Sequence, residues 1–89
     1  MSIAKINELL EQIKNDRTVP KNVRNSIEIA QNDLTDKSKD ALVKINSAIS
    51  ILEEASNDTN IPTYTRTQIW NIISMLEVLN EKQKRKKGN

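Results

Sequence analysis

Residues 57–76 read NDTNIPTYTRTQIWNIISML, and they repeat a pattern that the chain has already used once. A shift of 42 positions (62 − 20 = 42) places Pro20 on Pro62 and Asp16 on Asp58. The same shift aligns further identical or similar pairs: Asn15 with Asn57, Val19 with Ile61, Arg24 with Arg66, Ile27 with Ile69 and Leu34 with Leu76. Each Pro follows a short polar connection and has the fixed φ that suits a first helical turn. The sequence therefore indicates one helical hairpin used twice.

The composition favours helix almost throughout. The 89 residues include 12 Ile, 7 Leu, 4 Val and 5 Ala but only one Gly and two Pro, so little of the chain suits loops. Apolar residues recur at helical spacing in four segments. These segments predict helices over residues 3–14, 20–34, 38–56 and from 62 to a frayed end near 82.

Four helices joined by short links lie antiparallel to their neighbours, and a bundle buries four single apolar stripes economically. We therefore expect an all-α, antiparallel four-helix bundle over residues 1–81, built from similar hairpins at about 3–34 and 38–81. A basic flexible tail is expected at 82–89. The 42-residue period also matches two stacked HEAT-like helix pairs. Two repeats are too few for a solenoid with its own buried core, which favours the bundle.

The chain contains no Cys and no His, which excludes disulfides and thiolate or imidazole metal ligands. Catalysis would have to use carboxylates, Lys or hydroxyl groups. The acidic candidates occupy ordinary solvent-facing or capping positions: Asp36, Asp40, Glu53, Glu54 and Asp58. There is no Gly-rich phosphate loop. We expect no enzymatic activity, no cofactor, no metal and no small-molecule substrate.

No apolar run approaches the length of about 20 residues that a membrane span needs, so no membrane partner is expected. Glu8 and Glu11 interrupt the apolar pattern of the first helix, which argues against a signal peptide. These features predict a cytoplasmic protein.

The most repeated polar feature is a loop Asp followed by an Arg in the next helix, Asp16 with Arg24 and Asp58 with Arg66. An Arg in a first helical turn could bind a phosphate or a carboxylate. The simpler interpretation is that each Arg pairs with its own loop Asp and fixes the turn. Duplication favours this structural interpretation, because a structural solution is copied with the fold.

Tyr64, Arg66 and Trp70 form a possible partner surface on the last helix, with Glu77 nearby. A half-exposed Trp beside an Arg is a common anchor in protein interfaces, and it could also stack on a base. Trp70 replaces Glu28 of the first hairpin, so the feature is specific to the second. The alternative is a Trp that covers the rim of the bundle core.

Ile29, Val43 and Val78 fall outside the inward-facing stripes of their helices. Single exposed aliphatic residues are common and need no function. If the three side chains converge, they make a patch for a second copy of the chain or for another partner.

The segment 82–87 has a possible polyanion contact in Lys82, Lys84, Arg85, Lys86 and Lys87, while residues 1–80 are slightly acidic. Clustered cations bind nucleic acids by releasing counterions. The same composition is typical of a disordered, solubilising terminus.

Residues 48–62 and 65–77, together with the segment Val19-Pro-Lys-Asn-Val-Arg24, resemble the archaeal proteins of uncharacterised protein family 0147. The resemblance covers the chain except for the basic end. It implies an all-helical bundle from the archaeal cytosol, and it brings no activity, cofactor or catalytic residue.

The sequence leaves two functional hypotheses. The favoured one is a non-catalytic protein-interaction or assembly module that binds another protein or a second copy of itself. The alternative is an RNA- or ribosome-associated protein in which the basic end supplies the affinity.

Overall fold

The computed structural model describes residues 2–88, with side chains described for residues 2–85. The chain forms four helices: α1 (Ile3–Lys14), α2 (Lys21–Thr35), α3 (Ala41–Ser56) and α4 (Thr63–Gly88). No residue within 2–88 belongs to a strand. The predicted all-α class is confirmed, and the predicted helix ends differ by at most three residues except at the end of α4.

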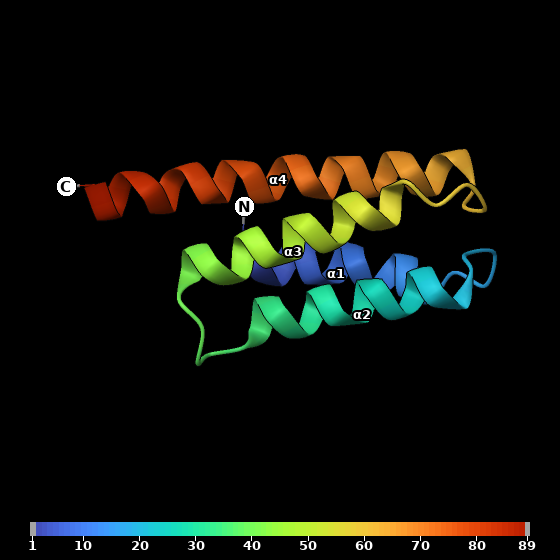
Figure 1. Cartoon of the computed structure of the whole chain (residues 1–89), viewed down its shortest axis with the longest axis horizontal. Coiled ribbons are helices and arrows are strands. Elements are labelled where there is room, and N and C mark those ends of the chain that lie inside the picture. The colour runs from blue at the N-terminus through green and yellow to red at the C-terminus, as the bar shows by residue number, and fades with distance from the viewer. Residues whose placement is uncertain (1, 89) are drawn as a thin grey trace.

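The four helices form a closed ring (Figure 1). Helices that follow one another in the chain pack together, and α1 also packs against α4. The diagonal pairs, α1 with α3 and α2 with α4, have no Cα atoms within 8 Å of each other in the described chain. Stacked HEAT-like hairpins would pair the first helices of the two hairpins. The contacts therefore support the antiparallel bundle, whose extents are 44 × 22 × 19 Å.

The core is almost purely aliphatic, as the apolar stripes predict. Ile6 and Leu10 of α1 are fully buried, and Ile69 of α4 lies among them in the same cluster. The remaining helices contribute buried residues at helical spacing: Val23, Ile27, Ala30, Leu34, Ile45, Ala48, Leu52 and Ala55. Burial of these apolar stripes is the main source of stability, since the chain has no disulfide to add to it.

All three connections use the same turn. In each, an Asp carboxylate accepts a hydrogen bond from the backbone N–H two residues later, at 2.8 to 2.9 Å: Asp16 from Thr18, Asp36 from Ser38 and Asp58 from Asn60. This is the Asx turn, in which a short side chain replaces a backbone acceptor. The sequence alone does not decide which residues of the 36–40 loop cap the neighbouring helices. Asp36, Ser38 and Asp40 nevertheless have the same spacing as Asp, Thr and Pro in the 16–20 loop.

The end of α4 differs from the prediction. The sequence predicts fraying near residue 82 and a basic flexible tail at 82–89. In the structure, α4 continues to Gly88 and projects beyond the other three helices (Figure 1). Lys, Arg and Gln are strong helix formers. An ion pair between Lys84 and Glu81, with 3.6 Å between Nζ and Oε1, also reduces the repulsion among the cations.

Ile69→Ala should lower the free energy of unfolding by about 2 to 4 kcal/mol, because Ile69 is fully buried and its truncation leaves a cavity. Pro62→Ala should cost less than about 1 kcal/mol, because Pro62 mainly stiffens the unfolded chain before α4. Urea denaturation of the two variants measures both changes. Equal, small losses of unfolding free energy in the two variants would contradict the assignment of Ile69 to the core-facing side of α4.

Candidate functional site

Reciprocal hydrogen bonds join the two hairpins at the end of the bundle where their loops meet. The Tyr64 hydroxyl donates to Oδ2 of Asp16 at 2.7 Å, and Asn22 Nδ2 donates to Oδ2 of Asp58 at 3.1 Å. Tyr64 is the equivalent of Asn22 under the 42-residue shift, as Asp58 is of Asp16. Each hairpin therefore holds the loop of the other in the same way, as in a two-fold symmetric dimer.

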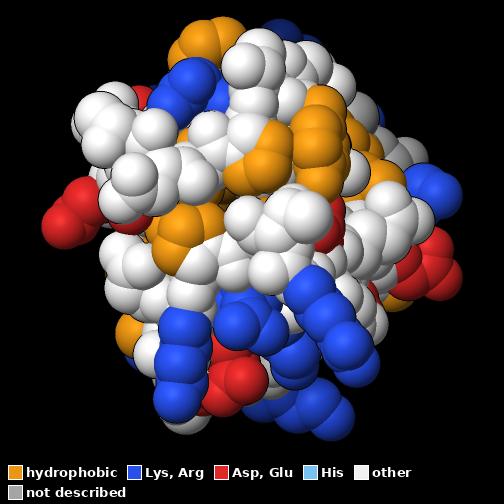
Figure 2. All heavy atoms as spheres, turned by 90° about the vertical axis from the view of Figure 1, so that its right-hand side faces the viewer, with side chains coloured by type: hydrophobic (Ala, Val, Ile, Leu, Met, Phe, Trp, Pro, Cys, Tyr) orange, Lys and Arg blue, Asp and Glu red, His pale blue; other side chains and the backbone are white. Residues whose placement is uncertain are grey.

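Figure 2 shows this end of the molecule. Apolar side chains gather in its upper half, on the side of α4, and Lys and Arg side chains gather below, on the side of α2. Val19 and Ile61, which precede the two Pro residues, are buried here. The basic segment at the end of α4 lies at the opposite end of the bundle (Figure 1).

The hydrogen bonds lower the pKa of the loop carboxyl groups. The side chain of Thr18, then Tyr64 and the backbone of Thr18, lower the pKa of Asp16. The backbone of Asn60, then Asn22 and the charge of Arg66, lower that of Asp58. A lowered folded-state pKa adds stability above the unfolded pKa, near pH 4, and the gain is lost as the pH falls through the folded pKa. The loops should therefore weaken in acid.

Tyr64→Phe removes one of the hydrogen bonds that stabilise the ionised carboxylate of Asp16. The pKa of Asp16 should therefore rise toward its ordinary value, and stability below about pH 4 should depend less steeply on pH. Carbon-13 NMR titration of the Asp side chains measures this shift. Asp36 is the internal control, because its carboxylate is bonded to Ser38 and its pKa should stay unchanged. An unchanged Asp16 pKa in the variant would show that the bond is absent in solution.

The two repeated Arg residues do not behave alike. Arg66 donates from Nε to the backbone oxygen of Ser56 and from Nη2 to that of Asp58, both at 2.9 Å. It therefore fixes its own turn, as the structural interpretation predicts, but through carbonyl groups and not through the Asp carboxylate. Arg24 has a buried Nε with no hydrogen-bond partner in the described structure. Duplication preserved the residue but not the contact.

The predicted surface of Tyr64, Arg66 and Trp70 is divided between two sides of α4. Tyr64 and Arg66 are two residues apart, so they point about 160° away from each other around the helix. Tyr64 contacts the 15–20 loop and Arg66 the end of α3. Trp70 lies on the Arg66 side and is 53% exposed. This exposure agrees with the predicted half-exposed Trp, and both interpretations of Trp70, as an interface anchor and as a cover for the core rim, stay predictions.

The three aliphatic residues outside the core stripes are exposed but do not converge. Ile29 is 53%, Val43 56% and Val78 44% exposed. Ile29 and Val78 lie on α2 and α4, which are diagonal in the ring. The three side chains therefore do not form a single patch.

Two of the carboxylates considered for catalysis or metal binding, Asp36 and Asp40, serve local structure. Asp36 closes its own turn, and Asp40 accepts a hydrogen bond from the backbone N–H of Leu42 at 3.2 Å as the N-cap of α3. Glu53 and Glu54 are exposed on α3. Among the residues whose side chains are described, no group of three or more acidic, His or Cys residues could hold a metal ion. No helix in residues 2–88 combines the length and apolarity of a membrane span.

The basic segment is presented on a helix. Lys82, Lys84 and Arg85 are exposed on the last turns of α4, and helical geometry spreads them over more than one side. Lys86 and Lys87, which belong to the same predicted contact, lie outside the described side chains. What the structure adds to the prediction is the helical conformation of this segment.

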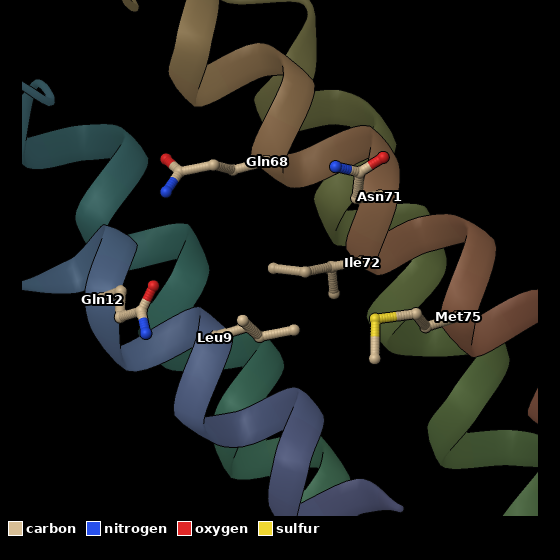
Figure 3. Close-up of a pocket in the computed structure, with 6 residues that line it drawn as sticks. All are labelled: Leu9, Gln12, Gln68, Asn71, Ile72 and Met75. Atoms are coloured by element: carbon tan, nitrogen blue, oxygen red, sulfur yellow. The ribbon is translucent and has the colours of Figure 1, made fainter. Parts of the chain in front are cut away.

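Sequence reasoning missed a groove between α1 and α4. It has a volume of about 270 Å³. Leu9 and Ile72 face each other across it, and Met75 lies beside them (Figure 3). The amide side chains of Gln12, Gln68 and Asn71 complete the lining. The groove depends on the separation of two helices that are distant in the sequence, and the sequence pattern carried no signal for it beyond two apolar residues at the edge of their stripes.

Comparison with known proteins identifies the family. A profile of the uncharacterised protein family (UPF0147) matches residues 1–79. The chain belongs to this family. The predicted resemblance is confirmed. The match ends one residue before Asn80, whose Nδ2 donates a hydrogen bond to Oδ1 of Asn46 in α3 at 3.1 Å.

Relatives in the UPF0147 family come from several archaea. A protein from Sulfurisphaera tokodaii is 45% identical over 73 residues, 82% of each chain. One from Methanocaldococcus jannaschii is 46% identical over 69 residues, 78% of this chain and 74% of the relative. The crystal structure of a protein of unknown function, MMP1188, is 41% identical and superposes with a TM-score of 0.81, covering 84% of this chain and 85% of that one. These names assign no activity, so the function of the family is unknown.

Proposed function

We propose that this UPF0147 protein is a non-catalytic module that binds another protein through the side of α4 around Trp70. The observation that carries the proposal is the exposure of this side chain, which is the only Trp in the chain and lies outside the core. Trp and Arg are enriched among the residues that dominate binding energy in interfaces. The proposal includes a cytoplasmic location, which the family resemblance implies.

The surroundings of Trp70 favour tight recognition. Arg66 lies one helical turn before Trp70 on the same side, and its two bonds to backbone oxygens fix the guanidinium. A surface that is ordered before binding loses less conformational entropy when the partner docks. The equivalent of Trp70 in the first hairpin is Glu28, which forms an ion pair with Lys14 at 3.7 Å. The aromatic side chain therefore does not belong to the duplicated structural pattern.

Trp70→Ala should abolish recovery of the partner while leaving the fold intact. The test is a tagged pull-down from archaeal cytosol in high salt after nuclease treatment. Val78→Ala is the matched control, because Val78 is also exposed on α4 but on another side. A stoichiometric protein should be recovered with the wild type and with Val78→Ala, and lost with Trp70→Ala. Equal recovery with Trp70→Ala would contradict the proposal.

A second candidate function is RNA binding, which is supported by the projection of exposed Lys82, Lys84 and Arg85 beyond the bundle on α4. Affinity for single-stranded RNA should then fall steeply with salt, and removal of residues 82–89 should eliminate most of it. Partners that disappear from the pull-down after nuclease treatment would favour this function over the first.

A further inference from the structure

The groove between α1 and α4 has a counterpart elsewhere in the bundle. The 42-residue shift places α2 on α4 and α1 on α3, so the α1–α4 contact is the equivalent of the α2–α3 contact. The same shift places Asp33 on Met75 and Lys5 on Ser47. In the α2–α3 contact, the carboxylate of Asp33 accepts hydrogen bonds from Lys39 Nζ and from Ser47 Oγ, both at 2.6 Å. A carboxylate thus links these two helices on the side away from the core.

The α1–α4 contact lacks this carboxylate. Met75 takes the place of Asp33, and the equivalence sets Lys5 of α1 opposite it, where Ser47 stands in the other contact. The nearest acid on α1 is Glu8, whose Oε2 lies 3.8 Å from Lys5 Nζ, with both side chains largely exposed. An exposed ion pair of this kind contributes little. Lys5 is therefore available to an acidic group from outside the chain.

The groove is apolar at its centre, and helical geometry places two Lys residues beyond one of its ends. Leu9 and Met75 line it, Lys5 lies one turn from Leu9 on α1, and Lys82 lies two turns from Met75 on the same side of α4, about 10 Å along the axis. Because α1 and α4 are antiparallel, both Lys residues lie toward the same end. The opposite end leads to the bond between Tyr64 and Asp16.

The lining also has unused hydrogen-bonding capacity. Oε1 of Gln68 is buried and has no partner among the side chains that the structure describes, and Gln12 and Asn71 line the same groove (Figure 3). A volume of about 270 Å³ is below the range of roughly 300 to 1,000 Å³ that is usual for small-molecule sites. The space suits an aliphatic side chain of a larger partner, and the amide groups suit its polar flanks.

We propose that the α1–α4 groove binds an acidic amphipathic helix of another protein. An aliphatic side chain of that helix packs between Leu9, Ile72 and Met75, and acidic residues one to two turns away pair with Lys5 and Lys82. The partner supplies the carboxylate that Asp33 supplies in the α2–α3 contact. The site is distinct from Trp70, which is about 140° from Met75 around α4, so the inference does not depend on the proposed function.

The test is selection of a library of helical peptides against the immobilised full-length protein, followed by fluorescence anisotropy with the enriched peptides. These should share an aliphatic residue with acidic residues four to seven positions away. Met75→Gln, which keeps the volume of the side chain, and Lys82→Glu should each weaken binding by about tenfold or more. Lys84→Glu is the matched control: it makes the same charge change on another side of α4 and should alter the affinity less than about threefold.

Several results would overturn the inference. These are the absence of an enriched class, enrichment of peptides without acidic residues, and equal effects of Lys82→Glu and Lys84→Glu, which would indicate diffuse attraction. Dimerisation of the wild type that Met75→Gln abolishes would assign the groove to a second copy of the chain. Lys82→Glu keeps the test valid if Met75→Gln lowers the melting temperature, because Lys82 is exposed. Peptides that carry Lys in place of their acidic residues should restore binding to the Lys82→Glu variant.

Discussion

The structure depends on the burial of one aliphatic stripe from each of four helices. With no disulfide in a chain of 89 residues, this burial supplies most of the stability. The closing contact between α1 and α4 is the one that no loop enforces, since these helices are the first and last in the chain. It is held by the core beneath it and by the bond from Tyr64 to Asp16 at one end. The groove lies in this contact.

The duplicated sequence separates structural residues from the others. Where both hairpins keep the same interaction, as at Asp16 and Asp58, the residue serves the fold. At two positions on α4, the second hairpin replaces a paired acid of the first by an apolar residue: Trp70 stands for Glu28 and Met75 for Asp33. Trp70 leaves apolar surface exposed, and Met75, which packs partly buried against the core, leaves apolar surface in the groove. For this reason α4 carries both proposed contacts.

The sequence predicted the features that short-range patterns control. Apolar spacing and the two Pro residues located the helices, and the repeat predicted the hairpins. The prediction from sequence failed for features that depend on contacts between residues far apart in the chain. The partners of Tyr64 and Asn22 lie on the other hairpin, and the groove depends on the spacing of α1 and α4. At residue 82, charge repulsion was given too much weight relative to the helix propensity of Lys and Arg. Tyr64 and Arg66 were assigned to one surface although their spacing sets them on two.

Site-specific photo-crosslinking in living archaeal cells tests most directly the claim that α4 carries the functional contact. A photoreactive phenylalanine analogue would replace Trp70 in one variant and Val43, an exposed residue of α3, in another. We predict one discrete protein adduct from position 70 and none from position 43. Adducts of equal yield from both positions, or adducts with RNA alone, would contradict the account.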